Sequence, residues 1–105
     1  MDLSKKDLDM FFKDYQLESL RVLWESDEGL FSRDVWERVN DLRNQSISRT
    51  SIIIFLNNMV ERGILSGTDL PGPGGYKTRY EAKMSERELK QHLAKIVKAK
   101  LDEMN

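Results

Sequence analysis

The stretch ISRTSIIIFLNNMVERGIL, residues 47–65, decides the fold. Its middle opens with three isoleucines and a phenylalanine in a row, Ile52 to Phe55, which on their own would also suit a buried strand. Helical spacing, however, gathers its larger apolar residues on one face, namely Ile52, Phe55, Leu56 and Met59. Ser48 is a good N-cap, and Gly63 is typical of the position just beyond a helix C-terminus. The stretch therefore predicts a helix over 48–62 with one buried face.

The opposite face of this helix is small and polar except for Ile54, with Ile53 half exposed on the flank. Hydroxyls and free N–H groups at a helix N-terminus suit phosphate oxygens. An Asn side chain can bond an adenine edge, and an exposed aliphatic side chain can pack on a thymine methyl. The candidate DNA-binding residues of this helix are Ser48, Arg49, Thr50, Ser51, Ile53, Ile54 and Asn57. The alternative is a capped structural helix with one stray exposed isoleucine.

Two shorter helices are expected before this one. Residues 16–26, QLESLRVLWES, have leucines at helical spacing, and Leu30 and Phe31 then form a short extended link. Ser32 is expected to cap a second helix over 33–43. The inward residues of that helix are predicted to be Val35, Val39 and Leu42. A polar stretch at 44–46 leads into the central helix.

After Gly63 the period of the pattern changes from helix to strand. Residues 63–70 and 76–83 read as two strands, and PGPGG between them reads as a tight tip, which gives a hairpin over 64–83. On the second strand, Lys77, Arg79 and Lys83 alternate on one face. These cations could lie over a phosphate backbone, where each would release a counterion. They could equally protect an exposed sheet edge from aggregation.

The last helix opens with a capping box, Ser85 and Glu88, and runs to about Met104. Its apolar stripe is longer than one small domain needs to cover, and it consists of Leu89, Leu93, Ile96, Val97, Leu101 and Met104. We therefore expect residues 85–105 to form a homodimer. The alternative is that the stripe folds back on an N-terminal arm, residues 1–14, whose apolar side chains are Leu8, Phe11 and Phe12.

Composition excludes several kinds of site. The 105 residues fit one domain, and the absence of Cys excludes disulfides and thiolate metal sites. His92 is the single His, so neither a His-based triad nor a two-His metal site can be assembled. We expect no enzyme activity, no cofactor and no membrane contact, and a cytoplasmic location. The net charge of −1 hides an asymmetry: residues 1–45 carry seven Lys/Arg against eleven Asp/Glu, and residues 76–105 carry eight against five.

The order of these elements is helix, short strand, helix, helix and hairpin. Within residues 15–84 the chain resembles penicillinase-repressor regulators (BlaI/MecI-like), with kinship to PadR-like repressors. The stretches that carry the resemblance are LESLRVLW (17–24), SRDVWERV (32–39), SRTSIIIFLNNMVERGIL (48–65) and GGYKTRYEAK (74–83). The sequence departs from the family at Ile53 and Ile54, because the outward residues of this helix usually include a Lys or Arg.

The resemblance implies a fold that is mainly α with a small β-hairpin, a winged helix-turn-helix followed by a C-terminal dimerisation helix. It also implies a sequence-specific DNA-binding repressor that acts as a dimer. Helix 48–62 would then lie in the major groove of double-stranded DNA, with hairpin 64–83 as the wing. The rival hypothesis is a winged-helix protein-interaction module of the transcription machinery, in which Ile53 and Ile54 would contact a protein.

Overall fold

The computed structural model describes residues 1, 3–42 and 46–104. The elements, in chain order, are the 3₁₀ helix η1 (Asp7–Met10), α1 (Asp14–Trp24), β1 (Leu30–Phe31), α2 (Ser32–Asp41), α3 (Arg49–Glu61), β2 (Leu65–Gly72), β3 (Gly75–Ala82) and α4 (Glu86–Glu103). This is the predicted winged-helix order, and the fold class is confirmed. Residues 44 and 45 of the predicted polar link lie outside the described residues.

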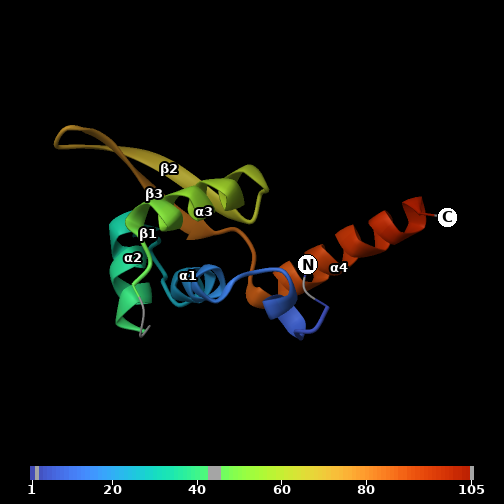
Figure 1. Cartoon of the computed structure of the whole chain (residues 1–105). Coiled ribbons are helices and arrows are strands. Elements are labelled where there is room, and N and C mark those ends of the chain that lie inside the picture. Colours follow the sequence, from blue (N-terminus) through green and yellow to red (C-terminus); the bar gives the residue numbers. More distant parts are fainter. Residues whose placement is uncertain (2, 43–45, 105) are drawn as a thin grey trace.

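The core lies where α1, α2 and α3 meet beneath the hairpin (Figure 1). The inward face predicted for α3 is confirmed, because Ile52 and Leu56 are fully buried and Phe55 and Met59 are nearly so. Each of the other two helices adds fully buried aliphatic side chains, namely Leu20 of α1 and Val35 and Val39 of α2. Burial of these side chains on helical spacing is the main source of stability for so small a domain.

The ends of α3 follow the predicted capping chemistry. The Ser48 Oγ accepts a hydrogen bond from the backbone N–H of Ser51 at 3.1 Å, which satisfies one of the free donors of the first turn. At the other end, Gly63 has a φ of 77°, a conformation that residues with a Cβ rarely adopt. These two residues fix where the helix begins and ends.

Two expectations for α2 were wrong. Ser32 is the first helical residue rather than the cap, and the backbone N–H of Phe31 donates instead to Asp34 Oδ2 at 3.2 Å. The Asp34 carboxylate thus accepts from the N–H of the N-cap residue, as the third residue of a capping box does, and the Ser32 hydroxyl is not the cap. Leu42, predicted to face inward, has 69% of its surface exposed because α2 ends at Asp41.

The three strands form one antiparallel sheet in the order β1-β3-β2. The hairpin strands are longer than predicted, since Gly72 pairs with Gly75 and only Pro73 and Gly74 form the turn. Gly74 has a φ of 80°, as the second central residue of a type II turn requires. The sequence pattern had assigned Pro71 and Gly72 to the tip, but β2 is an edge strand, where proline is tolerated.

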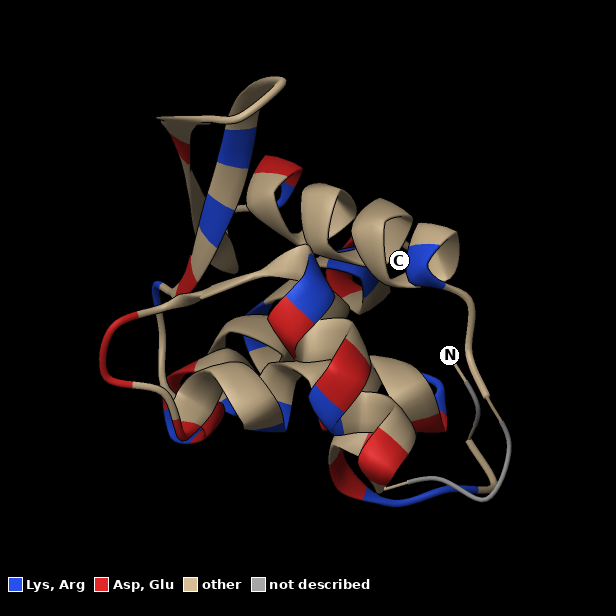
Figure 2. Cartoon of the chain, turned by 90° about the vertical axis from the view of Figure 1, so that its left-hand side faces the viewer, with Lys and Arg blue, Asp and Glu red and all other residues tan. Residues whose placement is uncertain are grey.

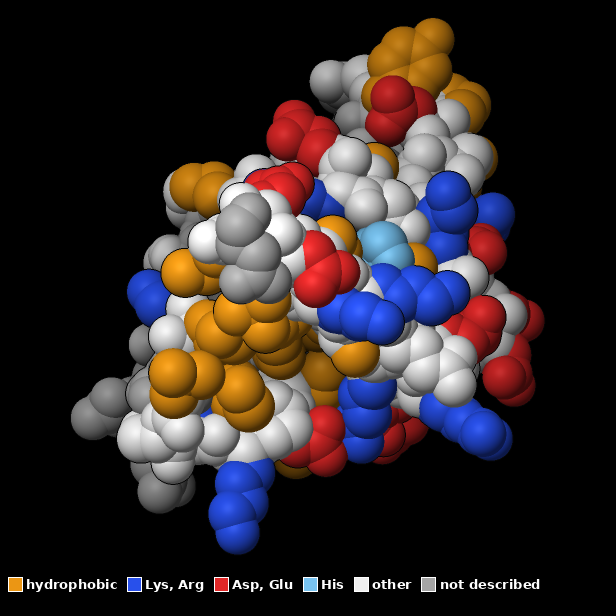
Figure 3. All heavy atoms as spheres, turned by 90° about the vertical axis from the view of Figure 1, so that its right-hand side faces the viewer, with side chains coloured by type: hydrophobic (Ala, Val, Ile, Leu, Met, Phe, Trp, Pro, Cys, Tyr) orange, Lys and Arg blue, Asp and Glu red, His pale blue; other side chains and the backbone are white. Residues whose placement is uncertain are grey.

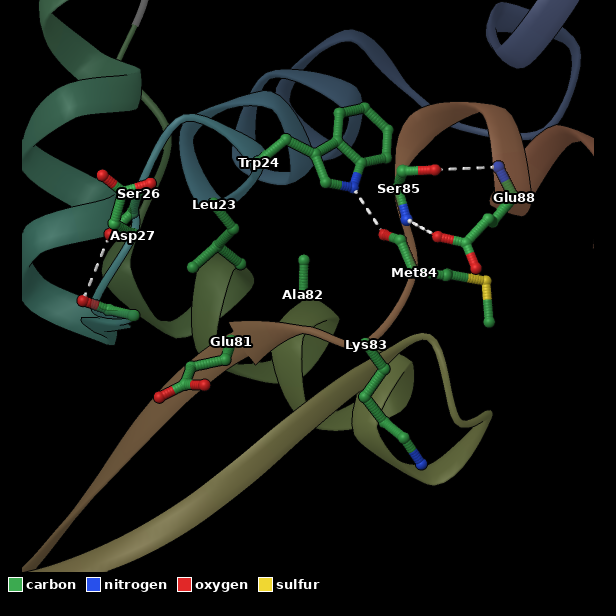
Figure 4. Close-up of a pocket in the computed structure, with 11 residues that line it drawn as sticks. Leu23, Trp24, Ser26, Asp27, Glu81, Ala82, Lys83, Met84, Ser85 and Glu88 are labelled. Atoms are coloured by element: carbon green, nitrogen blue, oxygen red, sulfur yellow. Dashed lines mark hydrogen bonds between the residues drawn. The ribbon is translucent and has the colours of Figure 1, made fainter.

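Helix α4 leaves the body at a junction that several contacts fix (Figure 4). The predicted capping box is confirmed: Glu88 N–H donates to Ser85 Oγ at 3.1 Å, and Ser85 N–H donates to Glu88 Oε1 at 3.0 Å. The indole N–H of Trp24 donates to the backbone oxygen of Met84 at 3.0 Å. Beyond this junction α4 projects from one end of the molecule and the hairpin from the other, giving extents of 53 × 30 × 23 Å (Figure 1).

Candidate nucleic-acid interface

The outward face of α3 carries the side chains that the sequence singled out. Arg49, Thr50 and Asn57 are exposed, Ile54 is 57% exposed and Ile53 is half-buried. The other two candidates are engaged in capping, because the hydroxyls of Ser48 and Ser51 lie 2.8 Å apart and share a hydrogen bond. Arg49 and Thr50 therefore present the more available polar groups at this helix end.

A hollow of about 260 Å³ lies between α3, β3 and the start of α2. Three cations line it, namely Arg33 of α2, Arg49 of α3 and Lys77 of β3. Ile53 and Asn57 of α3 also line it, so the fold brings these candidates together with Lys77. Ile54 and Arg79 are not among its lining residues. Arg33 was not predicted as a site residue, although its place at the start of a helix was readable from the sequence.

The two candidate cations of the hairpin differ in their surroundings. The Lys77 ammonium lies 5.9 Å from the centre of the Phe31 ring, within the range of a cation–π contact. The Arg79 Nε lies 3.3 Å from Glu81 Oε1, so a carboxylate on the same strand partly neutralises that guanidinium. Figure 2 shows the basic bands along the projecting hairpin. Lys77 is therefore the less neutralised of the two.

Two tyrosines of β3 belong to this region, and neither was predicted. Tyr76 is 78% exposed beside the hairpin tip, whereas Tyr80 is almost fully buried. The Tyr80 hydroxyl donates a hydrogen bond to Asn57 Oδ1 at 2.6 Å, which joins the hairpin to α3. Burial raises the pKa of Tyr80, so the phenol keeps its proton at neutral pH.

The apolar stripe of α4 is covered only near its start. Leu89, predicted as a dimerisation residue, is completely buried in the core of its own chain, so its side chain offers no surface to a partner. Leu93 and Val97 are half-buried, and three residues of the stripe are exposed, namely Ile96 at 43%, Leu101 at 57% and Met104 at 80%.

The N-terminal arm packs beside this first part of α4. Leu8 and Phe12 are buried, and Asp7 Oδ2 lies 3.0 Å from the Lys90 ammonium. Between the arm and α4 remains an apolar hollow of about 670 Å³, and Figure 3 shows the orange side chains gathered on this side of the molecule. The arm therefore covers part of the stripe, as the folded-back alternative predicted, and leaves the distal half open.

A further hollow, of about 320 Å³, lies at the α4 junction between Trp24, Glu81 and Glu88 (Figure 4). Glu88 is engaged there by the capping box, and Glu81 pairs with Arg79. Within the described ranges, no group of three His, Cys, Asp or Glu residues could hold a metal ion. The helices of the described part of the chain include none long and apolar enough to cross a membrane.

Comparisons with solved structures agree with this fold. A structure of the Vibrio cholerae ferric uptake regulator (Fur) has a TM-score of 0.54 at 19% identity, over 72% of this chain and 56% of that one. The chain thus spans little more than half of that relative. The Thermoplasma acidophilum protein TA0346, described as a transcriptional regulator, has a TM-score of 0.58 at 18% identity, over 86% of this chain and 91% of that one.

No curated protein matched the sequence. The model of the penicillinase repressor family, by contrast, matches residues 13–104, which include all of α1, α2, α3, the hairpin and α4. This match confirms the resemblance to penicillinase repressors inferred from the sequence. The arm before residue 13 lies outside it. The chain belongs to the penicillinase repressor family.

Proposed function

We propose that this protein is a sequence-specific DNA-binding repressor that acts as a homodimer, with α3 in the major groove and the hairpin β2–β3 as the wing. The observation that carries the proposal is the hollow in which Asn57 and Ile53 of α3 lie among Arg33, Arg49 and Lys77. Groups able to read a base edge are thus flanked by groups able to bind phosphates, on the helix that this fold presents outward.

The phosphate contacts would come from the rim of this hollow. Arg49 extends from the first turn of α3, where the helix dipole also favours an anion, and Lys77 extends from the facing strand. Cations on two sides of a recognition helix match the two sugar-phosphate strands that border a major groove. The net charge of −1 does not oppose this arrangement, because binding responds to the local field of a surface.

The base contacts would come from the middle of α3. Asn57 has an amide for hydrogen bonds to a base edge, and Ile54 has an exposed aliphatic side chain that fits a thymine methyl. Thr50 is small enough for the backbone of α3 to approach the bases closely. The readout would therefore depend more on apolar and amide contacts than on Arg–guanine pairs.

Dimerisation would place two recognition helices on one operator. One winged helix has a small footprint, and such proteins usually pair over two half-sites. The exposed distal stripe, Ile96, Leu101 and Met104, is continuous with the apolar hollow beside the arm, and together they form the open apolar surface of α4. A second copy of this chain supplies a matching apolar surface, because an isologous interface is complementary to itself.

The rival function, a protein-interaction module, is favoured by one observation. Ile54 is exposed on α3 beside the half-buried Ile53, and an apolar pair of this kind also suits a protein partner. The two functions differ in their response to salt, because neutralised phosphates release counterions and an apolar protein contact does not.

Titration of mixed-sequence duplex DNA at two salt concentrations tests the proposal. We expect weak binding that falls steeply as salt rises, with a selected operator bound at least about a thousandfold more tightly than mixed sequence. The control is a variant with Arg49→Gln and Lys77→Gln, which should bind mixed DNA more weakly and with a shallower salt dependence. No binding at low salt would overturn DNA binding and favour the protein-interaction module.

The dimer has a separate test. Ile96→Asp with Leu101→Asp should give a monomer by sedimentation at micromolar concentration, because carboxylates on an apolar interface must lose their hydration. Both side chains are exposed, so the monomer fold should remain intact. Gln91→Asp with Ala99→Asp is the matched control, with the same added charge on the opposite side of the stripe, and should stay dimeric. A wild-type protein that sediments as a monomer would overturn the dimer.

A further inference from the structure

The hydrogen bond between Tyr80 and Asn57 joins two elements that no sequence pattern relates. The Tyr80 ring belongs to the core and is 3% exposed, while its hydroxyl reaches Asn57 Oδ1 at 2.6 Å. Asn57 lies on the outward face of α3 with an exposed side chain. The bond therefore runs from a fixed point inside the molecule to a side chain on the candidate DNA-contacting surface.

The direction of this bond determines which end of the amide is turned away from the hairpin. An Asn side chain has an oxygen that accepts and an NH₂ group that donates, and rotation by half a turn exchanges them. Because the Tyr80 hydroxyl is the donor in this bond, the Asn57 oxygen is the end held at Tyr80. The NH₂ group, with its two donors, is then the end free to meet a ligand.

The hairpin is held in place against α3, so the position of the Tyr80 hydroxyl relative to that helix is fixed. Tyr80 pairs with Leu30 of β1 on one side and with Gly67 of β2 on the other. A Cβ at Gly67 would lie 3.1 Å from Thr78 Cγ2 and 3.4 Å from Val60 Cγ2, so β2 passes close to α3 at this residue. The register of the sheet and this close approach together fix the Tyr80 hydroxyl relative to Asn57.

We propose that Tyr80 is a positioning residue for DNA readout, whose hydroxyl fixes the Asn57 amide so that its NH₂ group meets a purine N7 at one base pair of the operator. The inference rests on the proposed DNA-binding function and refines it. From the residue type alone, Asn57 is expected to contact adenine, because a free amide can offer both its donor and its acceptor to that base. With the oxygen engaged by Tyr80, the donor end dominates, and N7 is the acceptor that both purines present in the major groove.

The same bond makes readout depend on the position of the wing. If the hairpin moves relative to α3, the Tyr80 hydroxyl leaves the amide, and the amide is free to turn. A turned amide would offer its oxygen to the N4 donor of cytosine or the N6 donor of adenine instead. The base preference at this position therefore requires the hairpin to be packed against α3.

Selection from a randomised duplex library, with wild type and Tyr80→Phe compared, tests the inference. Phe keeps the buried ring and removes only the donor. We expect wild type to prefer a purine over a pyrimidine by about tenfold at one position of each half-site, and Tyr80→Phe to reduce this preference to about twofold. The preferences at other positions and the salt dependence should be unchanged, since no phosphate contact is removed.

Two controls separate positioning from a general structural role. Tyr15→Phe removes a tyrosine hydroxyl from α1, outside the hollow that Asn57 lines, and should leave the purine preference intact. In an Asn57→Ala background, Tyr80→Phe should cause no further loss of preference, because the hydroxyl acts through the amide. An unchanged purine preference in Tyr80→Phe, or an equal loss in both backgrounds, would overturn the inference while leaving DNA binding in place. A wild-type protein that selects no sequence would overturn the inference and the proposed function together.

Discussion

Helices α3 and α4 both carry an apolar stripe, but the two stripes are covered to different extents. On α3, Ile52 and Leu56 are fully buried by the other helices and the hairpin of the same chain. On α4, Leu89 is fully buried, yet Leu101 is 57% exposed. The difference shows that a regular apolar stripe predicts burial but does not identify the element or molecule that covers it. One stripe builds the domain, and the other remains available for a second molecule.

The largest expected effect comes from a substitution in the buried face of α3. Leu56→Ala should lower the free energy of unfolding by about 2–5 kcal/mol, because it leaves a cavity at a fully buried position. Leu101→Ala is the matched control on α4 and should change the stability of the monomer by less than about 0.5 kcal/mol. Urea denaturation at low and high protein concentration measures both. An equal loss at low concentration would show that α4 is covered within the chain.

The next effect concerns the outward face of α3. Asn57→Ala should weaken specific DNA binding by about 1–3 kcal/mol, since it removes the amide from the base edge, and should leave the fold intact. Asn58→Ala changes the neighbouring exposed Asn, which does not line the hollow, and should have little effect. Binding to a selected operator, followed by fluorescence anisotropy, measures both variants. Equal losses of operator affinity in the two variants would show that Asn57 makes no specific base contact.

A smaller effect tests whether the hairpin cations contact DNA phosphates or protect the sheet edge. Lys77→Gln with Arg79→Gln should weaken binding to all sequences alike and reduce the slope of log K against log salt by up to about 2, one counterion for each phosphate contact. Most of the change should come from Lys77, because Glu81 partly neutralises Arg79. Lys5→Gln with Lys6→Gln removes the same charge from the arm and serves as the control. An unchanged slope would assign the hairpin cations to protection of the sheet edge.

The smallest effect is a pH dependence at the base of α4. The pKa of Asp7 is lowered by its hydrogen bond to Lys90, and that of Glu88 by hydrogen bonds from the Ser85 backbone and hydroxyl. Groups with lowered pKa values stabilise the fold fully above their unfolded values, 3.8 and 4.5, and lose this contribution as pH falls through the lower folded values. The melting temperature of Asp7→Asn with Glu88→Gln should therefore depend less on pH between about 3 and 6. A curve parallel to that of wild type would contradict the two contacts.

Periodicity and capping chemistry were sufficient to predict most of the fold. The helical phase of α3 and the caps at Ser48 and Ser85 follow from residues close together in the chain, and the structure confirms them. The errors fell at element ends. Leu42 fitted the helical spacing although α2 had already ended, and Pro71 resembled a breaker although an edge strand accepts it.

The candidate site was predictable only in part, because its parts meet through the tertiary fold. The outward residues of α3 could be chosen from its helical phase. The bond from Tyr80 to Asn57 joins residues 23 positions apart, and nothing local to either residue indicates the other. Leu89 shows the same limit, since its spacing placed it in the dimer stripe and only its complete burial in the folded chain shows that it belongs to the core.

The sparse charge of α3 has a consequence for the proposed binding to DNA. Arg49 is the one Lys or Arg in the sequence of this helix, and affinity for random DNA grows with the number of phosphates neutralised. If α3 binds DNA as proposed, such a protein would dwell only briefly at each non-specific site. The roughly 10⁶–10⁹ competing sites of a chromosome then sequester a smaller share of its molecules. Few copies per cell would then suffice to occupy the operator.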